Sequence, residues 1–196
     1  FTEKKNTYQL KDIHTGLNLD DIIKQKDDGE AFPALVKTEK LFYEGQPVAG
    51  KSTSTTFNFD KLGNVTSFTD FGDPGPDDDI STAISYHVVA DKYIMDIPSS
   101  VTVSASGKVY RQRGSTIDGN GNTIQAQLYL EPAKIARFDM TYDGFGNMTS
   151  LKRPENATDQ RLKFTYLYDD QVQTYVTAIS DDYGYSSSAT YDFSFG

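Results

Sequence analysis

The segment from Gly45 to Ser52, GQPVAGKS, matches the G-x-x-x-x-G-K-S pattern of loops that bind nucleotide phosphates. Such a loop needs a strand before it and a helix after it, because backbone N–H groups and the helix N-terminus surround the phosphates. A strand-like run precedes the segment, but residues 53–59 are rich in β-branched side chains and predict a second strand. The context therefore favours a β-hairpin loop, and a nucleotide-binding enzyme is only a remote alternative.

Two acidic segments contain residue types that bind calcium. Residues 118–122, DGNGN, have the D-x-N-x-N opening of a calcium loop, but Thr123 replaces its sixth-position glycine and Tyr129 its twelfth-position glutamate. A hairpin turn explains this segment more simply. In residues 73–79, DPGPDDD, the carboxylates can chelate an ion or be solvated in an exposed loop, and the sequence leaves both open. We assign no metal site and no cofactor.

The sequence does not indicate an active site. His14 and His87 are the two histidines; they lie far apart, and neither accompanies a G-x-S-x-G phrase. The Asp doublets at 169–170 and 181–182 suggest a glycosidase pair, but neighbours in a strand point to opposite faces of a sheet. We therefore expect a protein that is not an enzyme.

Tyr183 and Tyr185 are the candidate ligand contacts. They flank Gly184 in a turn-like stretch, where exposed rings can stack on the apolar face of a sugar. The alternative is that both rings pack over the adjacent hairpin, and the absence of tryptophan argues against a lectin.

Composition disfavours several classes of partner and site. The net charge of −9 and the pI near 4.6 argue against nucleic acid, which calls for a basic surface. No run reaches the roughly 18 apolar residues of a transmembrane helix, and no signal peptide is visible. There is no cysteine, so no disulfide can form. Because the chain starts without Met and stops inside a repeat, we expect a piece of a longer protein, whose export signal can lie elsewhere.

Almost all of the expected elements are strands. Residues 1–36 are the least regular part, with a short helix predicted at 20–26. From Ala34 onward, apolar and polar residues alternate between Gly, Pro and Asp, which predicts antiparallel strands with one polar face. The alternation is clearest at 161–168 and 189–195. We divide the chain into a lead-in segment, 1–50, and a repeat region, 51–196.

One phrase recurs and supplies the turns. FDKLGNVTS at 59–67 returns as YDGFGNMTS at 142–150, with a partial copy at 117–122 and a truncated copy at 191–196. Asp at the first position and Gly at the fourth are typical of a type I turn that ends in a left-handed glycine. Each copy therefore predicts a strand, a tight turn and a strand. The predicted turn residues are Asp60, Gly63, Asn64, Asp118, Gly121, Asn122, Asp143, Gly146 and Asn147.

The spacing of the phrase predicts one hairpin per copy. Counting a degenerate copy at 168–169, the Asp positions 118, 143, 169 and 192 are separated by 25, 26 and 23 residues. The step from Asp60 to Asp118 is 58 residues, about twice as long. It includes residues 72–79, whose two prolines exclude a ladder strand, so we interpret this stretch as an insertion or a loop between repeats.

The Tyr-Asp-x-x-Gly-Asn phrases, followed by Val/Met-Thr-Ser, resemble the YD repeats of bacterial Rhs proteins, insecticidal toxin-complex shell components and teneurins. The resemblance covers residues 55–196. It implies an all-β fold of antiparallel β-hairpin repeats in a curved or spiralling sheet, as a partial YD shell or an open, barrel-like sheet. It also implies a secreted or cell-surface bacterial protein, because in that family the repeats form a hollow shell, often around a toxic polypeptide.

The sequence departs from that family in two respects. The chain is far too short to close a shell, and residues 73–75 are only an isolated match to the family's Asp-Pro self-cleavage motif. Our first hypothesis is a non-catalytic scaffold fragment, whose partners are other YD repeats of the same longer protein and a polypeptide cargo. The second is a surface module that binds a glycan or a protein.

Overall fold

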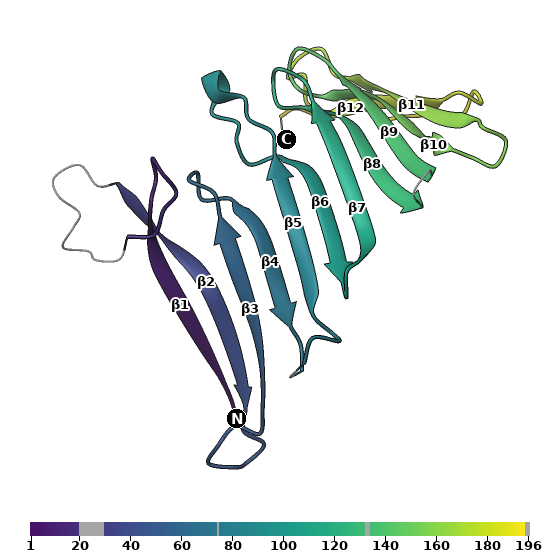
Figure 1. Ribbon diagram of the computed structural model, residues 1–196. Coiled ribbons are helices and arrows are strands. Elements are labelled where there is room, and N and C mark those ends of the chain that lie inside the picture. The colour runs from purple at the N-terminus through teal and green to yellow at the C-terminus, as the bar shows by residue number, and fades with distance from the viewer. Residues whose placement is uncertain (20–29, 74, 132–133, 195–196) are drawn as a thin grey trace. The chain divides into compact units, whose positions relative to one another are not determined.

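The computed structural model describes residues 1–19, 30–73, 75–131 and 134–194, and it confirms the predicted all-β class. Thirteen strands form one open antiparallel sheet, in which each strand pairs with its neighbours in sequence (Figure 1). The described residues include one short 3-10 turn, η2 (Ala90–Lys92), and no α-helix. No helix in this part of the chain is long and apolar enough to span a bilayer. The strands are β1 (Thr2–Asp12), β2 (Ala31–Phe42), β3 (Lys51–Phe59), β4 (Val65–Phe71), β5 (Ile80–Tyr86), β6 (Pro98–Ala105), β7 (Lys108–Ile117), β8 (Thr123–Glu131), β9 (Lys134–Tyr142), β10 (Met148–Glu155), β11 (Arg161–Tyr168), β12 (Val176–Asp181) and β13 (Ser186–Ser188).

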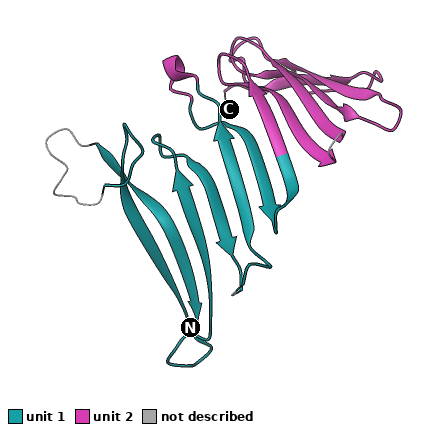
Figure 2. Ribbon diagram, in the orientation of Figure 1, with its two compact units in different colours: residues 1–88, 95–112 teal, residues 89–94, 113–196 magenta. Residues whose placement is uncertain are grey.

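The chain forms two compact units (Figure 2). The first comprises residues 1–88 and 95–112, and the second comprises residues 89–94 and 113–196. Strands β1 and β2, from the expected lead-in segment 1–50, belong to the first unit, where β2 pairs with β3.

The beginning of the chain is more regular than expected. Strands β1 and β2 pair from Thr2↔Phe42 to Asp12↔Ala31, with one bulge after Thr7. Lysine, glutamate and threonine dominate β1, so its sequence lacks the apolar alternation that reveals a strand. The helix predicted at 20–26 lies outside the described residues.

The end of the chain is less regular than expected. Residues 189–194 form no strand, although alternation predicted one at 189–195. Strand β13 stops at Ser188, and Ala189 donates one further ladder hydrogen bond to the carbonyl of Thr177 (3.0 Å). Tyr191 then bonds to the preceding hairpin through its hydroxyl, which donates to the Val176 carbonyl (2.9 Å).

The double step between Asp60 and Asp118 contains a hidden repeat. Residues 72–79 connect β4 to β5, so they form a loop between two hairpins. This was one of the two interpretations of that stretch, the other being an insertion. The missing turn is the connection 87–97 between β5 and β6, where Tyr86-His87 replaces the Tyr-Asp phrase. It is longer than the other copies and holds η2, which explains why no match to the phrase is visible there.

The sheet has one polar face and one more apolar face in the first unit. Cross-strand pairing aligns Phe57, Phe68, Thr82 and Val103 in one row across β3–β6. The adjacent position on each strand belongs to the opposite face, where Thr56, Thr69, Ser81 and Ser104 form a row of hydroxyls. Among the described residues, Ala34 is the only fully buried apolar side chain. The sheet is therefore stabilised without a conventional core.

Candidate functional site

The repeated turns hold one hydrogen-bond pattern. In the turn at Asp143, the carboxylate Oδ1 accepts the backbone N–H groups of Phe145 and Asn147 (both 2.9 Å), and Oδ2 accepts Nδ2 of Asn147 (3.1 Å). Gly146 has φ +86°, the left-handed conformation that this turn requires. The same bonds recur at Asp60 with Asn64 and at Asp118 with Asn122.

Hydrogen bonds within the turn lower the pKa of two of these carboxylates, Asp118 and Asp143. The hydrogen bond from Asn122 is the main reason why the pKa of Asp118 is lowered. Burial alone would raise the pKa of Asp143, but hydrogen bonds from the Asn147 side chain and backbone lower it overall.

Two further turns have this hydrogen-bond pattern although they do not match the repeated phrase, and a turn was expected only at the second of them, residues 183–185. Asn156 Oδ1 accepts the N–H groups of Thr158 and Gln160, and Asp159 takes the left-handed position with φ +58°. Asp181 and Gly184 do the same between β12 and β13. A search for Asp or Asn followed three residues later by Gly, Asp or Asn, without the preceding tyrosine, would have found both.

The degenerate copy at Asp169 forms a wider loop, and its aspartate accepts more backbone hydrogen bonds than the other turn aspartates do. Its carboxylate is 6% exposed and accepts five backbone N–H groups from residues 171–175. Burial alone would raise the pKa of Asp169, but these hydrogen bonds, with Tyr175 contributing most, hold it well below its usual range.

Four tyrosine hydroxyls bond to the hairpin that precedes them, three from the end of a strand and Tyr191 from the segment after β13. Tyr142 donates to the carbonyl of Thr123 (3.0 Å), the first residue of the strand that follows the preceding turn. Tyr168 donates to Met148 in the same way (3.0 Å). The four donor and acceptor pairs are Tyr86 with Val65, Tyr142 with Thr123, Tyr168 with Met148, and Tyr191 with Val176.

The tyrosines pack beside the turns that they bond to. Burial, followed by the charge of the aspartate in the preceding turn, raises the pKa of Tyr86, Tyr142 and Tyr168. The turn amides add a second link in the opposite direction, from a turn to the connection in the following hairpin: Nδ2 of Asn64 donates to the Met95 carbonyl (2.8 Å) and Nδ2 of Asn147 to the Gln173 carbonyl (2.6 Å). We call the tyrosine and asparagine bonds together the inter-hairpin contacts.

A charged network crosses the second unit. The guanidinium of Arg161 on β11 is 8% exposed, and it bonds to the Asp139 carboxylate on β9 and to backbone carbonyls of β9 and β10. Burial raises the pKa of Asp139, but hydrogen bonds from Arg161 and Gln125 lower it overall. A fully paired carboxylate of this kind serves structure, because its oxygens are already occupied.

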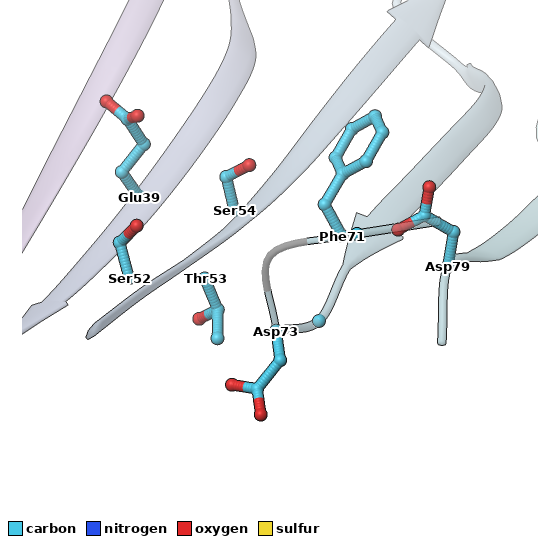
Figure 3. Close-up of a pocket in the computed structure, with 9 residues that line it drawn as sticks. Glu39, Ser52, Thr53, Ser54, Phe71, Asp73 and Asp79 are labelled. Carbon is cyan, nitrogen blue, oxygen red and sulfur yellow. The ribbon is translucent and has the colours of Figure 1, made fainter. Parts of the chain in front are cut away.

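The phosphate-loop match does not have the required context. Residues 43–50 connect β2 to β3, and β3 begins at Lys51, so a strand follows where a phosphate-binding loop needs a helix. The Lys51 ammonium lies 3.3 Å from the Asp73 carboxylate. Near this connection, Ser52, Ser54 and Phe71 line a cavity of about 350 Å³ (Figure 3).

The other candidate residues do not converge on one site. Asp118 is occupied by its turn, and the Asp78 carboxylate accepts the Asp73 N–H (2.7 Å). Throughout the described ranges, no three or more His, Asp or Glu side chains are placed to hold a metal ion. His14 lies 4.0 Å from the exposed Glu30, and His87 stands at the start of the β5–β6 connection.

Tyr183 and Tyr185 lie in the turn between β12 and β13, with exposed fractions of 65% and 76%. Tyr185 borders a shallow cavity of about 250 Å³ that Phe164 and Ile179 also line. Residues of both Asp doublets accept hydrogen bonds from the backbone. Asp169 and Asp181 accept N–H groups of their own loops, and Asp182 accepts the N–H of Lys163.

Replacing Gly146 by Val should lower the free energy of unfolding by about 1–3 kcal/mol, because a β-branched residue resists a positive φ. Urea denaturation measures the change. Gly144→Val in the same turn is the matched control, since Gly144 has no positive φ and an added Cβ there meets open space. Equal stability of the two variants would contradict the assigned turn.

Tyr168→Phe should lower the free energy of unfolding by about 1 kcal/mol, because it removes one hydrogen bond and leaves the Met148 carbonyl without that donor. Tyr183→Phe at an exposed turn is the control and should be neutral. If both variants unfold at the same urea concentration as the parent, the inter-hairpin bond does not stabilise the sheet.

Stability should fall in acid. The folded-state pKa values of Asp169 and Asp143 lie below the value of about 3.9 in an unfolded chain, so their contribution is complete above that pH and is lost as pH falls through the folded pKa. Unfolding free energy measured by urea should be flat from pH 8 to about 5 and then decrease. Asp169→Asn should be destabilised most at neutral pH, and a gap to the parent that stays constant down to pH 2 would refute the linkage.

No protein-family model matches the chain, and no curated protein sequence matches it. Among solved structures, it is similar to a chain of the Photorhabdus luminescens Tc holotoxin pore with mutated TccC3, with a TM-score of 0.50, 15% identity, and coverage of 82% of this chain and 9% of that chain. It is also similar to a chain in the crystal structure of TcdB2-TccC3-TEV, with a TM-score of 0.50, 14% identity, and coverage of 96% and 11%. The chain thus spans about a tenth of the length of these chains. At such identity the likeness shows the fold, and it supports the fold that the YD-repeat resemblance implies.

Proposed function

We propose that this chain is a non-catalytic scaffold segment of a longer, exported or cell-surface bacterial protein of the Rhs type. Its hairpins would form part of a shell wall, and its partners would be further YD repeats of the same protein and an enclosed polypeptide. The recurring tyrosine bond between successive hairpins is the observation that carries this proposal.

A bond of this kind suits a protein that is built from repeated units. In repeat proteins each unit contacts its neighbours, so stability is the sum of unit and interface terms. The same donor, the same acceptor position and the same turn recur in both units of this chain. Side chains that are able to do chemistry, such as Asp169 and Asp139, are instead occupied by structural hydrogen bonds.

The last described residues repeat the contacts that open the earlier turns. Tyr191 already bonds to Val176, and the Asp192 carboxylate accepts the N–H of Ser194 (3.0 Å), as Asp143 accepts from Phe145. The rings of Tyr175 and Tyr191 lie 4.8 Å apart, which adds an aromatic contact across this link. These contacts match those of the earlier copies, as expected for a protein built from repeated units.

The solved structures support the scaffold at the level of the fold. One of them belongs to a Tc holotoxin pore, and the YD-repeat resemblance connects such complexes with shells. The enclosed cargo and the export of this protein rest on that resemblance.

Internal duplication tests the scaffold proposal. A second copy of residues 142–167, inserted before Tyr168, adds one hairpin and one tyrosine contact without changing either end of the chain. Two added strands should lengthen the particle by about 10 Å, measured by small-angle scattering, and should increase strand content in circular dichroism.

The control is a flexible Gly/Ser insertion of equal length in the turn at Ser106 and Gly107, which should add no strand. A duplicated variant whose dimensions and strand content equal those of the parent would overturn the proposal. It would favour the second candidate, a self-contained binding module, for which the exposed rings of Tyr183 and Tyr185 are the supporting observation.

A further inference from the structure

The polar face of the first unit contains a cavity of about 350 Å³ beside the β4–β5 connection. Glu39, Ser54 and Phe71 line it as one cross-strand row on β2, β3 and β4, because Glu39 pairs with Ser54 and Ser54 pairs with Phe71. In Figure 3 these side chains project to the same side, and Asp79 also lines the cavity. Thr53 and Asp73 project to the other side.

The Phe71 ring is an apolar surface in polar surroundings. It is 38% exposed and stands beside a serine hydroxyl and two carboxylates. An aromatic face provides contact for C–H groups, while carboxylates and hydroxyls accept or exchange hydrogen bonds with O–H groups. A molecule that offers both kinds of group on one compact ring is a saccharide.

The charges around the cavity disfavour other ligands. The neighbouring ammonium groups are held in ion pairs, Lys37 with Glu39 (2.8 Å) and Lys51 with Asp73 (3.3 Å), so a phosphate would face carboxylates. A cation site is not supported either, because the described residues offer no cluster of three or more ligating side chains.

The rest of the face could accommodate a ligand longer than the cavity. The rows next to Phe71 consist of neutral side chains on β3–β6, so a neutral chain lying over these strands would meet hydroxyl groups, one amide and one methyl group, and no charge. These rows are Thr56, Thr69, Ser81 and Ser104, and then Asn58, Ser67, Ala83 and Thr102.

The rim of the cavity includes a hydrogen bond between two described residues of the β4–β5 connection. The Asp78 carboxylate accepts the Asp73 N–H (2.7 Å) across the β4–β5 connection. Gly72 permits this bond, since a Cβ there would collide with the Asp78 carboxylate. A preorganised rim reduces the entropy that binding costs.

We propose that the cavity at Phe71 binds a neutral carbohydrate chain, with one sugar ring on Phe71 and its hydroxyl groups bonded to Glu39, Ser54 and Asp79. This goes beyond the scaffold function and uses none of the inter-hairpin contacts. A failure here therefore leaves the scaffold proposal intact, and the duplication experiment leaves this cavity unchanged.

Titration of the full chain with maltotetraose, cellotetraose and chitotetraose tests the proposal by amide NMR shifts. At least one probe should shift the amide signals of residues 39, 52–54, 71–73, 75 and 77–79, with a Kd at or below about 1 mM. Phe71→Ala should weaken that binding at least tenfold. Asp79→Asn keeps the ring and should weaken it severalfold.

Phe145→Ala removes another exposed ring, at the turn of β9 and β10, and should bind like the parent. Amide spectra that are unchanged away from the cavity show that the Phe71 variant is folded. The proposal is overturned if none of the three probes binds at about 10 mM, if Phe71→Ala and Asp79→Asn both bind like the parent, or if the shifts gather at Tyr183 and Tyr185 instead.

Discussion

The hydrogen bond from a tyrosine hydroxyl to the backbone of the preceding hairpin is the interaction on which this sheet depends. A sheet normally buries one face against a second layer, and here almost no apolar side chain is fully buried. Order must therefore come from within the layer. The ladder fixes strand to strand, and the half-buried rings of Tyr142 and Tyr168 fix hairpin to hairpin, because each covers its neighbour and satisfies one of its carbonyls.

Local turn chemistry made the fold predictable, and long-range pairing limited the prediction. The Asp-x-x-Gly-Asn turns depend on bonds within five residues, so the phrase reveals both the turns and the antiparallel hairpins. The tyrosine bonds span about twenty residues and leave no local signal. The repeat after Tyr86 was missed because its connection lacks the aspartate, and β1 because charged residues conceal its alternation.

The two proposed ligand sites, at the tyrosines of the β12–β13 turn and at Phe71, show the same limit of prediction from sequence. The exposed rings of Tyr183 and Tyr185 could be anticipated, because a glycine between two tyrosines next to serines suggests an exposed turn. The row of Glu39, Ser54 and Phe71 could not, since it exists only after three strands have paired in register. The GQPVAGKS match lies near that row, but a strand follows it where a phosphate-binding loop needs a helix. A short motif therefore predicts a function only when its structural context agrees.

The two outer strands of the described sheet differ in how readily they would accept a further strand. At one end of β1 the outer side is already bonded, because Leu19 donates to the Leu10 carbonyl (2.8 Å) and Asp12 donates to the Leu17 carbonyl (3.0 Å). Lys4 and Lys5 lie on the rest of β1, and an approaching strand would have to desolvate their ammonium groups. Strand β13 is short and consists of exposed serines, which carry no charge to desolvate. Of the two edges, the serine edge would therefore pair with an added strand at a lower cost in desolvation than the lysine edge.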